Sequence, residues 1–350
     1  MPGIEGGFEE TFRGIAFLVA RFTTFTAHAF IFGLVPFLFF VLRPSFAGVG
    51  EAGWSEGRAR LSRRLEDLVQ AALVGSAIAT IVSLLLQATL IAEGTGGDVG
   101  SDTFSAIAST PFGQWHLLRF PLLLGLAVLL VRHVEKSALA GAGDDRRSPT
   151  MTWWAAWSGL ATGLLLTNSM SGHAFVATPQ VVSIPNDVIH LASGSTWLTG
   201  IVLMAMVLPS AWRGKDDDDR VRMLTPVVIR FSKLAAISIA IIAITGTINS
   251  FLDIGKLSDM IDTRYGRSLT IKIGAFLFVL ALGGVNHFYV RHKLETNDRA
   301  RSSAHLFRRT IAIELALGVA IIGVTAVLTG QARTREATDP ASSVTSAPRT

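Results

Sequence analysis

PVVIRFSKLAAISIAIIAITGTINSFL, residues 226–252, is a nearly continuous apolar run. A helix that crosses a bilayer needs about 20 consecutive, mainly apolar residues, so this run is long enough to span. The same reading applied along the chain finds further candidate runs. They lie at roughly 15–41, 67–92, 114–132, 152–173, 187–208, 269–290 and 308–330. The sequence therefore predicts an all-α, polytopic membrane helix bundle with eight transmembrane helices.

The composition agrees with this class. Hydrophobic residues make up 50% of the 350 residues and charged residues 16%, whereas an average soluble domain is about 25% charged. The net charge of +5 does not indicate nucleic-acid binding, because the basic residues fall in short clusters between apolar runs. The chain has no cysteine, so a metal site must use histidine, methionine, carboxylates or backbone. No GxxxxGK[ST] motif is present, which argues against ATP hydrolysis.

Loop charges predict the orientation. Arginines and lysines gather after the first, third, fifth and seventh runs, whereas the loops at 94–112 and 174–186 have none. Since cytoplasmic loops are the ones enriched in these residues, both termini are expected outside. We divide the chain into a short extracytoplasmic N-terminus (1–14), a membrane domain (15–330) and a disordered, Ser/Thr/Pro-rich tail (331–350). The N-terminus lacks the basic region of a cleaved signal, so the first run is expected to be retained.

Four histidines share the outer half of this topology. His116, His173 and His190 lie at outer helix ends, and His28 lies deeper in the first run. Ionisable groups in spanning helices are costly and are functional candidates. The four imidazoles are therefore candidate ligands for a metal site in the outer half of the bundle, and the sequence leaves open whether all four share it. The alternative is that each one hydrogen-bonds a neighbouring helix.

Spacing adds two details to this site. Met170 and His173 are three residues apart and share a helix face, and a thioether beside an imidazole suits copper, especially Cu(I). Asp187, His190, Gly194 and Trp197 follow the spacing of one helix stripe. Asp187 is then expected either to hydrogen-bond the His190 ring or to cap the start of its helix.

Three further polar residues fall within or near apolar runs. Arg119 and Lys272 are expected about one turn inside the outer surface, where their long side chains could also reach the interface. Glu314 lies nearer the inner surface. We predict that Glu314 pairs with an inner arginine such as Arg230 rather than with Lys272.

An ordered set of motifs now resembles a known family. The motifs are GHA, D-x-x-H, W-L-x-G, Y-G-R-x-L-x-x-K and R-x-x-x-x-E, in that order, and the likeness covers nearly all of residues 15–330. They resemble the CopD copper-resistance proteins of the bacterial cytoplasmic (inner) membrane. The resemblance implies a role in moving or handling copper beside a separate extracytoplasmic copper-binding protein.

Residue by residue, the resemblance covers most of the candidate site. His173 and His190 match motif histidines, with Asp187 and Trp197 in the same motif. Lys272 and Glu314 match polar positions of the last two helices. His28 and His116 are less directly matched.

Two metal-binding functions remain open on the sequence, beside a structural subunit that binds no metal. The preferred one is a copper-binding protein that moves Cu⁺ or Cu²⁺ across the membrane, which would not be an enzyme. The alternative is a protein that holds haem b between two histidines, which would be an electron carrier, a copper reductase or another membrane oxidoreductase. The short loop between His173 and His190 favours a small ion over the two opposite faces of one haem.

Overall fold

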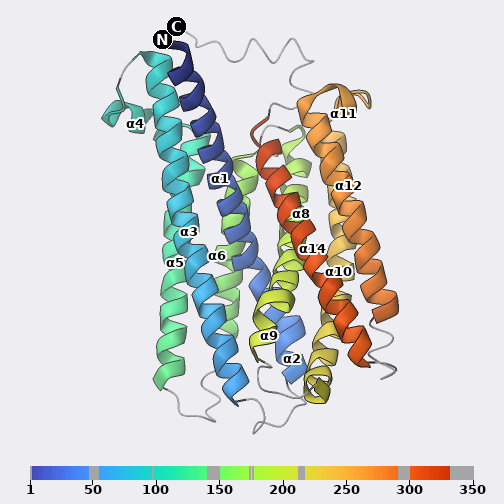
Figure 1. Ribbon diagram of the computed structural model, residues 1–350. Coiled ribbons are helices and arrows are strands. Elements are labelled where there is room, and N and C mark those ends of the chain that lie inside the picture. Colours follow the sequence, from blue (N-terminus) through green and yellow to red (C-terminus); the bar gives the residue numbers. More distant parts are fainter. Residues whose placement is uncertain are drawn as a thin grey trace.

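The computed structural model describes residues 2–46, 55–96, 98–139, 150–172, 175, 177–211, 217–290 and 300–331. Every regular element in these ranges is a helix, and the long helices run side by side as a bundle (Figure 1). The long helices are α1 (Pro2–Pro36), α3 (Ser55–Thr95), α5 (Pro111–Leu139), α6 (Met151–Met170), α8 (Gln180–Val202), α10 (Asp217–Asp253), α12 (Arg264–Gly284) and α14 (Ala300–Leu328). The shorter elements are η1 (Phe37–Leu42), α2 (Arg43–Phe46), α4 (Ser101–Ser109), η4 (Leu203–Val207), α9 (Leu208–Ala211), α11 (Asp259–Asp262) and η5 (Val285–Val290).

Helices α1 and α8 form the centre of the bundle. Helix α1 packs against α3, α6, α8 and α14, and α8 packs against α1, α6, α10 and α14. Ile31, Trp157 and Ile201 are fully buried where α1, α6 and α8 meet. The Trp157 indole N–H donates to the Ile31 carbonyl across this junction, at 3.1 Å. The first turns of α1 and the last turns of α14 point toward the same end of the bundle (Figure 1).

The outer surface of the bundle is apolar. Large side chains such as Leu124, Ile244 and Phe278 are 66%, 64% and 63% exposed, and they come from three different helices. Exposed apolar area this extensive is unfavourable in water and favourable against lipid tails. Together with the helix lengths, this surface identifies a multi-pass membrane protein.

Seven helical segments of the described chain are long and apolar enough to cross a membrane. Helix α6 is the predicted span that is missing from this set. Its three tryptophans, together with Thr167, Asn168 and Ser169, lower its mean hydropathy, although it is 20 residues long and packs inside the bundle. The segments are Thr11–Ser45, Ala59–Gly94, Pro111–His133, Gln180–Val207, Met223–Asp253, Arg264–Gly284 and Arg309–Leu328.

Helix boundaries differ from the sequence prediction in several places. Helix α1 already begins at Pro2, and past Pro36 it continues as the π-helical η1. The short helix α4 lies in a loop for which no helix was predicted. Helix α8 begins at Gln180, seven residues before the predicted start at 187. The tail 332–350 lies outside the described residues.

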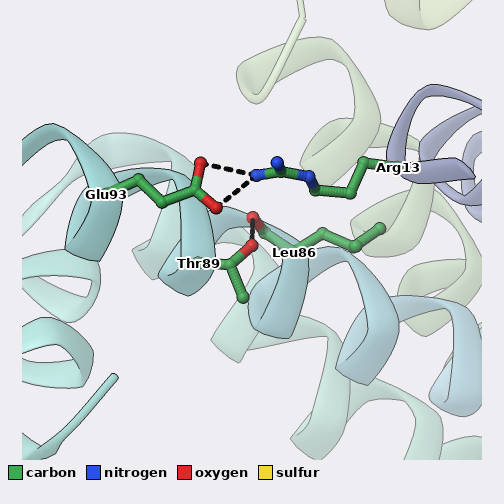
Figure 2. Close-up of polar contacts among 4 residues, drawn as sticks. All are labelled: Arg13, Leu86, Thr89 and Glu93. Atoms are coloured by element: carbon green, nitrogen blue, oxygen red, sulfur yellow. Dashed lines mark hydrogen bonds and ion pairs between the residues drawn. The ribbon is translucent and has the colours of Figure 1, made fainter. Parts of the chain in front are cut away.

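One ion pair joins α1 and α3 near their ends. In Figure 2 the Arg13 guanidinium faces the Glu93 carboxylate, with Nη1 2.6 Å from Oε1 and 2.5 Å from Oε2. The Glu93 side chain is 54% exposed. Because exposed ion pairs contribute little to stability, the bundle depends mainly on its packing.

Gly33 allows the closest approach of α1 and α8. A Cβ atom at this position would lie 2.2 Å from the Ser195 carbonyl oxygen and 2.4 Å from the Thr199 hydroxyl oxygen. The Thr199 hydroxyl donates to the Ala29 carbonyl at 2.9 Å in the same contact. Small residues of this kind let helix backbones pack closely in membranes.

Gly33→Ala should therefore separate the two central helices, at a cost of about 1–3 kcal/mol from overpacking. Gly159→Ala on α6 is the matched control, because nothing lies within 4 Å of its added Cβ. Thermal unfolding in detergent should give a lower Tm for Gly33→Ala and an unchanged or higher Tm for Gly159→Ala. Equal midpoints would mean that the close contact at Gly33 is unimportant.

Candidate metal site

A cavity of about 470 Å³ lies among α8, α10, α12 and α14, with contributions from α1 and α6. Its wall is mostly apolar, formed by side chains such as Trp197, Leu198 and Phe276. A small set of polar side chains faces this apolar space, which is the usual composition of a binding site. The main polar lining residues are Asp187, His190, Asn249, Asp253, Tyr265 and Lys272.

The predicted stripe on α8 lines this cavity. Asp187, His190, Gly194 and Trp197 all contribute to its wall. The prediction that Asp187 caps the helix is wrong, because α8 begins at Gln180 and Asp187 lies well inside it. Asp187 is therefore a side chain of the cavity wall.

The His190 ring is oriented by Thr245 of α10. The His190 Nδ1 lies 2.9 Å from the Thr245 Oγ1, and the Thr245 hydroxyl donates its only hydrogen to the Ile241 carbonyl at 2.6 Å. The Thr245 oxygen must therefore accept a hydrogen from Nδ1. This assignment leaves the lone pair of His190 on Nε2, which is the form of imidazole that binds metals.

Asp187 does not support the His190 ring. No hydrogen bond joins these two residues, both of which the structure describes; Asp187 instead accepts from the Asn249 amide at 3.3 Å. Asn249 in turn accepts from Asn186 at 2.7 Å, and Asn186 also donates to the Thr245 carbonyl at 2.9 Å. The predicted Asp187–His190 pair is thus wrong, because the amides of α8 and α10 bind the carboxylate into a separate chain of hydrogen bonds.

Lys272 extends into the same cavity from α12. Its principal electrostatic partners are the carboxylates of Asp187 and Asp253. The Tyr265 hydroxyl donates to Asp253 Oδ2 at 2.8 Å, which fixes that carboxylate at the end of α10. Among the residues that the structure describes, the cavity wall therefore carries one imidazole, two carboxyl groups and one lysine amine.

His28 belongs to a second polar cluster, which meets the cavity wall only at Asn168 among the described residues. Its side chain is 0% exposed, and its ring nitrogens lie 3.2 Å from Asn168 Oδ1 and 2.8 Å from Ser76 Oγ. Arg119 donates to the same Asn168 oxygen at 3.1 Å and to Thr167 at 3.0 Å. Since the amide oxygen only accepts, His28 Nδ1 carries a hydrogen and Nε2 accepts from Ser76. Both ring nitrogens of His28 are already occupied.

His116 is also held locally. Its Nδ1 donates to the Phe112 carbonyl at 2.8 Å, one turn earlier in α5. The ring stacks on the Phe112 ring with 3.9 Å between centroids. Neither His28 nor His116 lines the cavity that contains His190, so the structure does not bring these three histidines into one site.

The end of α6 approaches the cavity. Met170 is the last residue of α6 and is half-buried, while Gly172 lines the cavity. His173, the other predicted ligand on this segment, lies outside the described residues. Among the described residues, no group of three or more His, Asp or Glu side chains has a metal-binding arrangement.

Glu314 is separate from the cavity as well. Its Oε1 accepts from the Asn286 amide at 2.7 Å, and the Asn286 oxygen accepts from Thr310 at 2.6 Å. The predicted pairing with Arg230 is wrong: Arg230 is exposed, and a neutral amide takes its place beside the carboxylate.

Sequence reasoning missed several residues that organise these sites. Apart from Asp253 they are neutral side chains, and spacing gave one available signal: Thr245 and Asn249 are four residues apart and face the α8 stripe. The missed residues are Ser76, Asn168, Asn186, Thr245, Asn249, Asp253, Tyr265 and Asn286.

The fold and this cavity define a class: an all-helical, multi-pass membrane protein with a histidine and several charged groups facing an internal cavity. Two family models match the chain. The copper resistance protein D-like N-terminal domain matches residues 11–181, and copper resistance protein D matches residues 225–328. Over these two stretches the chain is similar to the copper resistance protein D family.

Two curated proteins are similar along most of the chain. The copper transport protein CutJ of Bacillus subtilis (strain 168) is 27% identical over 282 residues, which is 79% of this chain and 48% of CutJ. Copper resistance protein D of Pseudomonas syringae pv. tomato is 23% identical over 317 residues, which is 89% of this chain and 94% of that protein. The chain thus spans about half of CutJ and nearly all of the second relative. No solved structure matches the chain significantly.

The second polar cluster gives a test of the hydrogen-bond assignment. Asn168→Leu removes the oxygen that accepts from both His28 and Arg119, and each buried donor left unsatisfied costs about 1–3 kcal/mol. Asn168→Asp keeps an acceptor there. We expect thermal unfolding in detergent to show a large loss of Tm for Asn168→Leu and a small one for Asn168→Asp.

Thr162→Val on the exposed face of α6 is the control for this pair, since its hydroxyl bonds only the Ser158 carbonyl. A Tm for Asn168→Leu that matches Thr162→Val would contradict the assigned network.

Proposed function

We propose that this protein binds copper in the cavity between α8, α10 and α12 and carries it across the bacterial cytoplasmic membrane. The observation that carries the proposal is the His190–Thr245 hydrogen bond. It gives His190 the tautomer that binds metals, in a mostly apolar cavity of a protein similar to copper resistance proteins. The names of the two relatives, one for copper transport and one for copper resistance, support the same cargo.

His190 Nε2 is the first proposed ligand. Met170 and His173 are the proposed partners, because Gly172, between them in the chain, lines the same cavity. Imidazole and thioether ligands together suit copper. His28 and His116, whose rings are bonded to other groups, are assigned to holding the helices around Arg119.

The haem alternative has less support. It required His173 or His190 to face His28 or His116 across a haem, but His28 uses both ring nitrogens within its own cluster and neither residue lines the cavity. An absorption spectrum of the purified protein discriminates the two functions. A Soret band stoichiometric with the protein would contradict the copper-only proposal.

The chain is proposed to cross the membrane eight times. Helix α6 is the crossing added to the seven segments given above. An even number of crossings returns the chain to its starting side, in agreement with the ends of α1 and α14 at one end of the bundle (Figure 1). We assign that end to the outside from the arginine-rich loops at the opposite end. A separate extracytoplasmic copper-binding protein would then deliver the ion on the side of the 174–186 loop.

Cysteine labelling tests the α6 crossing, since the chain has no native cysteine. Met151 at the start of α6 and Thr178 beyond its end are both exposed. In intact cells, an impermeant maleimide should label Thr178→Cys and should not label Met151→Cys until the membrane is opened. Labelling of both positions from the same side would exclude α6 as a span, and labelling of Met151→Cys alone would invert the orientation.

Substitutions at His190 and Thr245 test the copper site itself. His190→Ala removes the ligand, and Thr245→Val removes the acceptor that orients it, which typically lowers metal affinity about 10–100-fold. Thr245→Ser keeps the hydroxyl and should bind as the wild type does. The measurement is competition for Cu⁺ with a chromogenic chelator, using the purified full chain.

His133→Ala is the control for loss of a histidine outside the cavity, where the ring lies against Trp153. Unchanged affinity in His190→Ala would remove His190 from the site. Equal affinities for Thr245→Val and Thr245→Ser would show that the hydrogen bond does not support the ligand.

A further inference from the structure

Lys272 places a positive charge inside the cavity in which we propose that a metal cation binds. The side chain lines the cavity together with Asp187, His190 and Asp253. An ammonium next to a cation site repels the bound cation and weakens its binding. The presence of Lys272 in this cavity therefore calls for a physical reason. The inference below rests on the proposed function.

The ammonium is near the two carboxylates without being in direct contact with either. Asp187 and Asp253 are its main electrostatic partners, yet among the described residues no nitrogen–oxygen pair within 4.0 Å joins Lys272 to a carboxylate. Lys272 therefore acts through its charge on the whole cavity. It is not tied up in a closed ion pair.

The charges of the cavity leave room for one positive charge. Among the described lining residues, Asp187 and Asp253 supply two negative charges when both carboxylates are ionised, Lys272 supplies one positive charge when its amine is protonated, and His190 is neutral in the tautomer fixed by Thr245. The sum is one net negative charge. A monovalent cation neutralises the cavity, whereas a divalent cation would leave an excess positive charge surrounded by apolar side chains such as Trp197.

We infer that Lys272 is the residue that makes this cavity selective for monovalent copper, Cu⁺, over divalent metal ions. The positive charge of Lys272 already neutralises one of the two carboxylates, so a single further positive charge makes the cavity neutral. The donor atoms agree with this choice. The His190 imidazole is a ligand that Cu⁺ accepts, whereas hard divalent cations require many more oxygen ligands than the two carboxylates supply.

Coulomb's law gives the inference a quantitative form. The repulsion between the ammonium and a bound ion is proportional to the charge of the ion. If removal of the Lys272 charge tightens binding of a monovalent ion by some factor, binding of a divalent ion at the same place should tighten by the square of that factor. A gain of about 10-fold for the first implies about 100-fold for the second. A change in cavity shape alone has no reason to follow this relation.

The experiment measures the affinities of Ag⁺ and Zn²⁺ for the purified full chain, by calorimetry or by chelator competition. Ag⁺ is a monovalent and Zn²⁺ a divalent probe, and neither changes oxidation state under the assay. Lys272→Leu removes the charge without adding a donor atom, and Lys272→Gln is a second neutral variant in case the first does not fold. Lys272→Arg keeps the charge, and Lys233→Met, at an exposed position of α10, controls for the loss of a lysine elsewhere.

The neutral variants should bind Zn²⁺ much more tightly than the wild type, with a smaller gain for Ag⁺, while Lys272→Arg and Lys233→Met keep the wild-type ratio. An unchanged ratio in the neutral variants would overturn the inference while leaving copper binding in place. A wild-type chain that binds neither Ag⁺ nor Cu⁺ would instead overturn the proposed function.

Discussion

A side chain that carries charge or hydrogen-bonding groups inside a membrane-spanning bundle must find its partners in the protein, because hydrocarbon offers none. The described chain meets this requirement in two different ways. Around Arg119, the guanidinium, the His28 ring and the Asn168 amide satisfy one another. Around His190, the Thr245 hydroxyl oxygen accepts from Nδ1, and the His190 side chain lines a cavity. The first arrangement closes a contact between helices, and the second leaves a place for a ligand.

This difference separates residues that the sequence cannot separate. The apolar runs determine the fold class, because length and hydropathy are properties of each segment alone. The α8 stripe was also predictable, since Asp187, His190 and Trp197 recur at helical spacing and do line one wall. The sequence could not predict that both ring nitrogens of His28 are hydrogen-bonded, because its partners Ser76 and Asn168 come from α3 and α6. Sequence spacing carries no information about which distant helix a ring will face.

Two errors in the predicted site have the same origin. Asp187 was paired with His190 because they are three residues apart, and Glu314 with Arg230 because opposite charges attract. In the bundle, neutral groups occupy both positions: Asn249 bonds Asp187, and Asn286 bonds Glu314. Amides and hydroxyls are cheaper than ions to bury. Amide and hydroxyl side chains are also common in apolar helices for reasons of packing. Those that have a function are therefore hard to recognise without the fold.

The most direct test of the account is X-ray absorption at the copper K-edge of the purified chain loaded with copper under reducing conditions. We expect an edge typical of Cu⁺, with outer-shell scattering from imidazole that decreases in His190→Ala and persists in His133→Ala. A spectrum that is the same in the wild type and in His190→Ala would contradict it, since copper would then be bound somewhere other than the cavity beside Thr245.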